Sequence, residues 1–381
     1  MASSITNCLL EWGLDTIFSI TVDNASSNDV TMIEMSKQLS NWGTNIMDGQ
    51  HLHVRCMEHI LNLIVQDGLK EIDKSVKRVR QVVKYIKQSI ARIKKFKECC
   101  ESQLIACKKC LCLDVPTRWN STYLMLETTQ HFVLAFERYS FYDNGFLDYL
   151  RTSPCEDGTK AGAFVNEDWE NVRTMVKFLE TFYDLTLKVF GSKYVTTNAH
   201  FVEIAELDLI LKEMIENKDS NLKKMAASMR EKFRKYWGTP DKMNKMIFIS
   251  SVLDPRNKLE YVSFAIVDMF GKEIGEKLSD LVESYMKALF EHYVKKSKNS
   301  LSSSTSSFFG NFSSINGYEN FQRREIMRTK LQFEKHKEIS GGSSNKSELG
   351  KYLAEEIEPD SEQFDILGWR KVTELRFPIL A

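Results

Sequence analysis

The sequence predicts an α+β protein that is predominantly α-helical. Thr16–Val22 is a β-branched and aromatic run typical of a buried strand, and His51–Arg55 has the character of a second short strand. From about Lys70 onward, apolar residues recur at spacings of three and four, which is the period of a helix. We therefore expect a small α/β unit near the N-terminus, followed by a large all-α domain.

The composition is that of a globular protein. The chain has 381 residues, of which 43% are hydrophobic, and this suffices for two or three units with cores of their own. No apolar run approaches the length that crosses a bilayer, and residues 1–7 lack the positive charge of a signal peptide. We expect a soluble intracellular protein with no membrane partner. The eight cysteines are then expected to be reduced thiols.

Asp23 is the strongest candidate for a catalytic or metal-binding residue. It directly follows the first predicted strand, and the capping-rich segment Asn24–Asp29 then leads into a helix. The carboxyl end of a strand is where an α/β sheet presents ligands. Phosphoryl-transfer enzymes use several such carboxylates to hold divalent metal ions. Asp23 is therefore a candidate metal ligand, and the alternative is that it only caps the helix.

A long basic helix is expected next. The apolar residues between Ile72 and Ile93 form one stripe of a single helix of about seven turns. Between Lys70 and Lys97 there are eleven Lys or Arg residues and two acidic ones. Such an excess can face phosphates, or it can be an ordinary solvated face. The candidate phosphate contacts are Lys77, Arg78, Arg80, Lys84 and Lys87.

Two further groups of residues could bind a ligand. Cys56 and His59 have ligand-like spacing and could form a zinc site with Cys107 and Cys110, although a buried cysteine and a hydrogen-bonded core histidine are favoured. Arg118 beside Trp119 can hold a phosphate and stack a base. The same pair can equally pack within a domain junction.

Amphipathic segments continue along the chain. We expect helices at residues 169–187, 201–215, 222–237 and 274–293. Ser300–Ser314 is too polar to bury much surface and is predicted to be disordered, and Ser340–Asn345 is a second break. After it, Leu349, Tyr352 and Leu353 predict one short helix.

Several segments together resemble plant hAT-superfamily transposases of the RICESLEEPER and DAYSLEEPER kind. They are Thr21–Asp29, Arg55–Lys70 and Asp114-Val-Pro-Thr-Arg-Trp-Asn-Ser121, in the order and spacing typical of that family. Lys232–Trp237 and Val252–Leu259 resemble its hAT-like RNase-H-fold region. Ser347–Leu353 and Phe364–Leu380 resemble the beginning of its C-terminal dimerisation region.

The resemblance implies an RNase-H-like sheet interrupted by a large all-α insertion. Residues 1–69 are then expected to be a partial RNase-H-like core, and residues 70–298 the helical insertion, with the hAT-like RNase-H-fold region at about 195–298. Residues 299–346 are expected to be a disordered linker, and 347–381 the start of a truncated dimerisation region. The last of these implies self-association into a homo-oligomer.

The resemblance also implies three metal-binding acids, of which Asp23 matches the second. The first belongs upstream of the strand that ends in Asp23, and the third follows the segment ending at Leu380. We therefore expect a non-catalytic chain with no bound cofactor, whereas the complete family enzyme implies Mg²⁺ or Mn²⁺. The family further implies that His59 lies near the scissile phosphate and that Trp119 stacks on distorted DNA.

The expected function is that of a transposase-derived, DNA-binding protein of the nucleus, without a small-molecule substrate. Two alternatives remain open. The chain is a fragment of an active metal-dependent hAT transposase whose gene boundaries are misplaced, or it is a protein-interaction module without DNA binding.

Overall fold

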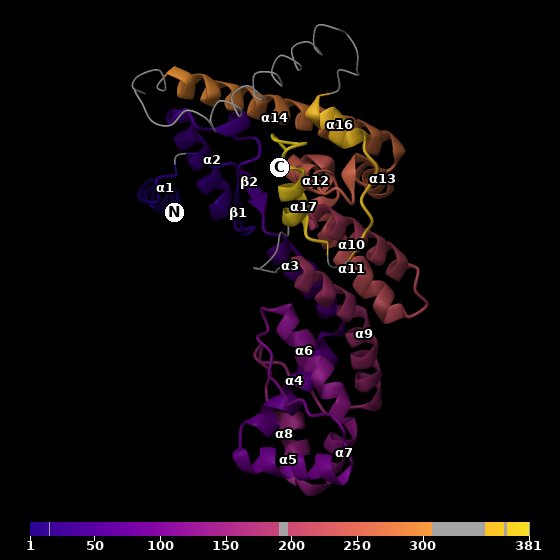
Figure 1. Ribbon diagram of the computed structural model, residues 1–381. Helices are drawn as coiled ribbons and strands as arrows, with labels where there is room; N and C mark the ends of the chain where they lie inside the picture. The colour runs from indigo at the N-terminus through magenta and orange to yellow at the C-terminus, as the bar shows by residue number, and fades with distance from the viewer. Residues whose placement is uncertain (15, 190–196, 307–346, 362–363, 381) are drawn as a thin grey trace, which may run out of the picture. The chain divides into compact units, whose positions relative to one another are not determined.

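The computed structural model of the chain describes residues 1–14, 16–189, 197–306, 347–361 and 364–380 (Figure 1). Most of its elements are helices, and two short strands form its sheet, so the predicted α+β, predominantly α-helical class is confirmed. Unit 1 consists of Met1–Leu253 and Tyr261–Leu278, and unit 2 of Asp254–Glu260 and Ser279–Ala381. Among the described residues, none of the helices combines the length and the apolar character that a bilayer crossing needs.

Unit 1 begins with a small α/β arrangement. β1 (Ile20–Val22) and β2 (His53–Arg55) pair in parallel, and α2 (Ser26–Asn41) provides the crossover that parallel pairing requires. Both predicted strands are present, each shorter than its apolar run. α1 (Ala2–Glu11) packs on α2, and a small core forms beside the sheet. Its buried members are Leu9, Met32, Met35, Leu39 and Leu52.

Helices make up the rest of unit 1 and continue into unit 2. They are α3 (Met57–Leu69), α4 (Asp73–Lys87), α5 (Ile90–Ser102), α6 (Trp119–Thr129), α7 (Val133–Tyr142), α8 (Asn144–Thr152), α9 (Asn166–Val189), α10 (His200–Ile215), α11 (Ser220–Trp237), α12 (Lys245–Val252), α13 (Lys258–Phe270) and α14 (Lys272–Ser306). The four helices expected between residues 169 and 293 are confirmed as α9, α10, α11 and α14.

The single long helix predicted from Ile72 to Ile93 is wrong. The chain breaks after α4, where Ser89 adopts an extended backbone with φ −143° and ψ 131°, and α5 begins at Ile90. The break lets α5 pack against α7, which places Phe96 in van der Waals reach of Phe132 and Phe136 in a buried aromatic cluster. Burying these rings offsets the lost helical turn. Ile90, a member of the predicted stripe, is left 87% exposed.

The α/β arrangement and the helices that follow share one packing unit. α3 runs beside α11, where Asp67 pairs with Lys232 at 2.8 Å and Glu71 accepts a hydrogen bond from Ser228 at 2.9 Å. Gly68 lies at the closest approach, because a Cβ atom built there would lie 2.6 Å from the Cγ and Sδ atoms of Met229. The absence of a side chain at Gly68 lets the Met229 and Met225 side chains pack directly on α3.

Unit 2 is organised by the turn at Asp254–Glu260. Lys258 has a φ of +48°, and its buried ammonium donates to the backbone oxygens of Glu355 and Glu356 at 2.8 Å. Those carbonyls follow α16 (Glu348–Ala354), the short helix predicted from Leu349, Tyr352 and Leu353, which is thus confirmed. The rings of Tyr352 and Phe377 meet edge to face in the core of this unit, beside α17 (Ile366–Thr373).

The polar segment Ser300–Ser314 was predicted to be disordered, and its first residues differ from that prediction. α14 continues to Ser306, so the first residues of that segment are helical. The remainder, and Ser340–Asn345, lie outside the described residues.

Candidate nucleic-acid interface

Asp23 lies where the sequence predicts it, at the carboxyl end of β1. Its Oδ1 accepts hydrogen bonds from the backbone N–H of Ala25 at 2.9 Å and from Nδ2 of the buried Asn28 at 2.6 Å. Both donors belong to the turn and first helical residues that follow β1, so the carboxylate closes the entry into α2. The side chain is otherwise exposed to solvent. The carboxylate thus fixes the turn before α2, whose N-cap position is Ala25 without a side-chain cap.

The residues around Asp23 do not make a magnesium or manganese site. The nearest further acid, Asp29, is turned toward basic partners, with Arg55 Nη2 at 3.5 Å and His53 Nδ1 at 3.7 Å. No group of three or more His, Cys, Asp or Glu residues within the described chain is arranged to hold a metal ion. One carboxylate does not satisfy the oxygen-rich coordination that these ions need.

In the described part of the chain, the cysteine and histidine candidates do not gather into a group that could hold a metal ion. All eight cysteines are free thiols. Cys56 precedes α3 and donates its backbone N–H to Val22 O at 2.8 Å, which ties it to the sheet. His59 follows on the first turn of α3 and is half-buried.

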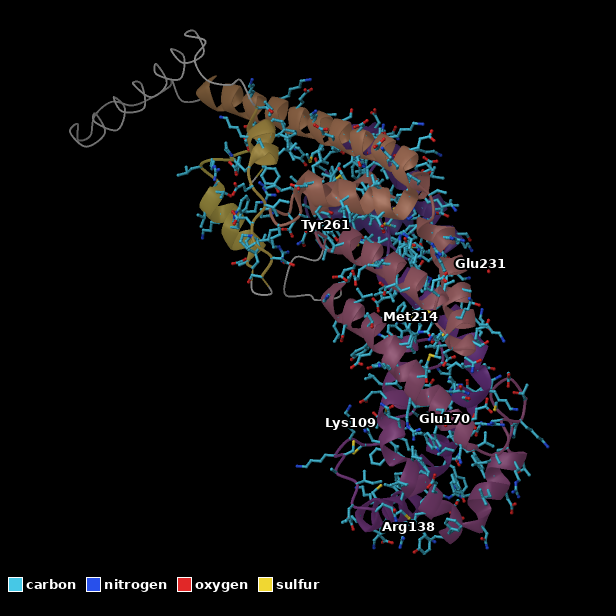
Figure 2. The ribbon with its side chains drawn as sticks, turned by 90° about the vertical axis from the view of Figure 1, so that its right-hand side faces the viewer. Lys109, Arg138, Glu170, Met214, Glu231 and Tyr261 are labelled. Atoms are coloured by element: carbon cyan, nitrogen blue, oxygen red, sulfur yellow. The ribbon has the colours of Figure 1, made fainter. Side chains whose placement is uncertain are left out.

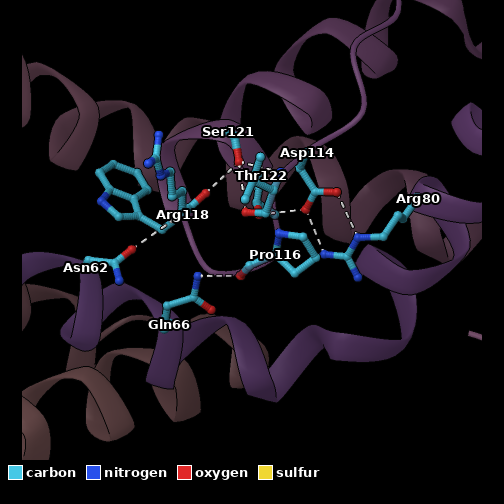
Figure 3. Close-up of polar contacts among 10 residues, drawn as sticks. Asn62, Gln66, Arg80, Asp114, Pro116, Arg118, Ser121 and Thr122 are labelled. Atoms are coloured by element: carbon cyan, nitrogen blue, oxygen red, sulfur yellow. Dashed lines mark hydrogen bonds and ion pairs between the residues drawn. The ribbon is translucent and has the colours of Figure 1, made fainter. Parts of the chain in front are cut away.

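One face of α3 contacts the loop before α6 and the start of α6, which lie about 50 residues further along the chain (Figure 3). Asn62 donates to Thr117 O at 3.2 Å and accepts from the backbone N–H of Trp119 at 3.1 Å. Gln66, one turn further along, donates to Pro116 O at 2.9 Å. His59 precedes Asn62 by three residues and therefore lies on the same face. The loop at residues 114–118 is consequently held beside the middle and second half of α3, the helix that follows β2.

Arg118 and Trp119 have opposite environments at the start of α6. The Arg118 side chain is exposed, and within the described residues its guanidinium has no carboxylate partner. Trp119 is 1% exposed and lies near Tyr123, with ring centroids 6.3 Å apart. The indole is therefore part of the core in this conformation and offers no face to a base.

Three of the five basic candidates on α4 point inward. Lys77 pairs with Asp73 and with Asp157, and these carboxylates raise the pKa of its ammonium. Arg78 pairs with the buried Asp168 at 2.7 Å. The Lys77–Asp73 pair lies within α4, whereas the pairs with Asp157 and Asp168 connect α4 to segments 80 and 90 residues along the chain.

Arg80 makes the strongest of these connections. Its Nε and Nη2 donate to the two oxygens of Asp114 at 2.8 and 2.7 Å, and the hydroxyl of Thr122 donates to the same carboxylate at 2.8 Å (Figure 3). The Asp114 side chain is fully buried and that of Arg80 is 16% exposed. A bidentate pair of this kind fixes both position and direction.

Lys84 and Lys87 are the α4 candidates that stay nearest to solvent. Lys87 is exposed and donates to Leu111 O at 3.1 Å. Lys84 is half-buried and lines a cavity of about 160 Å³ together with Lys77, Arg80 and Asp114. The basic excess of this helix is therefore only partly available to a ligand.

The sequence pattern did not identify three residues that hold the fold together around the site, namely Asn62, Gln66 and Asp168. Asn62 and Gln66 are polar residues four positions apart among the apolar residues of α3, a spacing that places them on one face and signals a specific partner. Asp168 carries no comparable signal, because its partners Ser75 and Arg78 lie some 90 residues away.

Comparison with known proteins supports the family. Residues 54–178 match the model of the ZBED1 RNase-like helical domain, and residues 198–293 match that of the hAT-like transposase, RNase-H fold. The chain is 31% identical over 387 residues to the zinc finger BED domain-containing protein RICESLEEPER 2 of Oryza sativa subsp. japonica, covering 100% of the chain and 51% of that protein.

Similar matches come from other plants. Identity is 27% over 382 residues to a putative AC transposase of Zea mays, of which 44% is covered, and 27% over 384 residues to DAYSLEEPER of Arabidopsis thaliana, of which 50% is covered. All of this chain is aligned in both cases. The chain spans about half the length of these curated relatives. As a homologue of RICESLEEPER, DAYSLEEPER and the AC proteins, the chain belongs to the plant hAT transposase family.

Proposed function

We propose that the chain binds DNA through the surface formed by His59 and Arg118, beside the carboxyl end of the sheet. The observation behind this proposal is that α3 is tied to two other segments. Cys56, just before α3, bonds to β1, and Asn62 and Gln66 bond to the loop and helix start at residues 116–119. The names of the relatives, BED zinc finger proteins and transposases, support DNA as the ligand. With DNA as the ligand, we expect the protein to act in the nucleus.

Arg118 is the residue best suited to contact a phosphate. Its guanidinium is exposed at the N-cap position of α6, where the helix dipole also favours an anion. The hydrogen bonds of Asn62 to the neighbouring backbone hold this turn in place. Lys84 and Lys87 belong to the proposed surface as secondary contacts, while Lys77, Arg78, Arg80 and Trp119 support it from within the fold.

Arg118→Ala is expected to weaken binding to a generic DNA duplex roughly tenfold, the effect of one charge-assisted contact. The slope of log affinity against log salt concentration should fall by about one, because one phosphate contact is lost. Electrophoretic mobility shift over a salt series measures both. Arg173→Ala is the matched control, because Arg173 is an exposed arginine on α9. Equal effects of both variants would contradict a specific role for Arg118, and absence of binding at low salt would favour the protein-interaction alternative.

We also propose that these 381 residues bind DNA without cutting it. Both hydrogen bonds of Asp23 serve the turn into α2, and Asp29 is neutralised by basic neighbours. Incubation with supercoiled plasmid and Mn²⁺ is expected to give no nicked product above the level of the Asp23→Asn variant. Nicking that Asp23→Asn abolishes would instead support the alternative that the chain is part of an active transposase, which the match to the hAT-like transposase fold favours. Homo-oligomerisation through residues 347–380 remains part of the proposal, with light scattering as its test.

A further inference from the structure

The end of unit 1 that is formed by α5, α7 and α8 carries an exposed aromatic pair (Figure 1). Phe141 is 84% exposed and Tyr142 is 52% exposed, both on the last turn of α7. Arg138 lies three residues before Phe141 and four before Tyr142, which places the three residues at neighbouring positions on the helix surface. Figure 2 shows Arg138 at the end of unit 1 farthest from Tyr261.

Two cations hold Tyr142 in place. Nη2 of Arg138 donates to the phenolic oxygen at 3.1 Å, and Cζ lies 5.5 Å from the ring centroid. Nζ of Lys95, from α5, donates to the backbone oxygen of Tyr142 at 2.8 Å and lies 5.7 Å from the same centroid. The ring is thus oriented by contacts that leave half of its surface open to solvent.

A cavity of about 200 Å³ opens beside this ring. Its lining residues are Lys95, Glu98, Cys99, Ser102, Arg138 and Tyr142. The lining contains two cations, Lys95 and Arg138, and one acid, Glu98. This excess of positive charge favours an anion with oxygen acceptors. Burial raises the pKa of the Cys99 thiol, which therefore stays neutral at the bottom of the cluster.

We propose that this surface, defined by Phe141, Tyr142, Arg138 and Lys95, binds single-stranded DNA. Unpaired bases stack on the two rings, and a phosphate of the same strand engages Arg138 and Lys95. A duplex hides the faces of its bases, so exposed rings beside cations discriminate in favour of an unpaired strand. The site goes beyond the proposed duplex-binding surface, because it lies at the opposite end of unit 1 from the sheet and uses a different form of nucleic acid.

The test uses the full chain and a fluorescent oligothymidylate of about 20 nucleotides, followed by anisotropy at low salt. Phe141→Ala and Tyr142→Ala are each expected to weaken binding roughly 5- to 150-fold, the range for loss of one stacked base. Leu134→Ala is the matched control, since Leu134 is an exposed apolar residue on the same helix, at 54% exposure, and carries no ring. Thermal unfolding checks that each variant is folded.

A second probe separates stacking from charge. An abasic oligonucleotide with the same number of phosphates is expected to bind the wild-type chain at least tenfold more weakly than oligothymidylate. Equal binding of the two probes, or unchanged affinity of both aromatic variants, would overturn the proposal. Phe141→Ala and Tyr142→Ala distinguish this site from the duplex-binding surface, because both should leave the affinity for a duplex unchanged.

Discussion

Asp114→Ala is expected to lower the free energy of unfolding by about 3–5 kcal/mol, the cost of leaving one charge of a buried ion pair without its partner. The variant leaves the Arg80 guanidinium, which is 16% exposed, without its two carboxylate acceptors, and Thr122 loses its hydrogen bond. Urea unfolding followed by circular dichroism measures the loss. The effect is large because the pair connects α4 to the loop before α6, and both ends of that connection are enclosed.

Asp157→Ala is the control for this prediction. Asp157 also pairs with a basic residue of α4, Lys77, but its side chain is 46% exposed. Solvent screening makes such a pair contribute little to stability, so the urea midpoint should stay close to that of the wild type. If Asp114→Ala unfolded at the same urea concentration as Asp157→Ala, the importance of the buried pair would be refuted.

Trp119→Ala is expected to destabilise the chain by about 3–5 kcal/mol, because it removes a large buried side chain and leaves a cavity. Trp119→Phe should cost clearly less, since much of the ring volume remains. The affinity of the folded protein for DNA should change little in either variant, because the indole is 1% exposed. The paired measurements are thermal unfolding and a DNA mobility shift at a temperature where both variants are folded.

The opposite outcome has a definite meaning. A Trp119→Ala variant that kept its stability and lost DNA affinity would identify the indole as a nucleic-acid contact. It would also require the start of α6 to open when DNA binds, because Asn62 and the ring packing with Tyr123 hold this turn closed in the structure.

Local patterns in the sequence predicted local structure well. The strand that ends before Asp23, the turn into α2 and the later amphipathic helices all follow from residue type and periodicity. The break at Ser89 could not be predicted in the same way. No proline or glycine marks it, and its cause is the packing of Phe96 against residues of α7 about 40 positions later.

The candidate site shows the same limit. The sequence predicted the position of Asp23, because that position depends on neighbouring residues, but it left open whether Arg118 is exposed or packed within a junction. It did not show that Arg80 serves the fold, since its partner Asp114 is 34 positions away. Basic residues on a helix have the same pattern whether their charges meet solvent, a phosphate or a buried carboxylate, and only the tertiary structure separates these cases.

The close approach of α3 and α11 at Gly68 bears on which parts of this chain can fold without each other. α3 belongs to the segment matched by the helical-domain family, and α11 to the segment matched by the transposase-fold family. Yet α11 covers the apolar side of α3, with Met225 and Met229 against the glycine. A gene rearrangement that separated the two segments would uncover that side of α3 and favour aggregation. A deletion that removes α3 or α11 is therefore expected to destabilise the helix that remains.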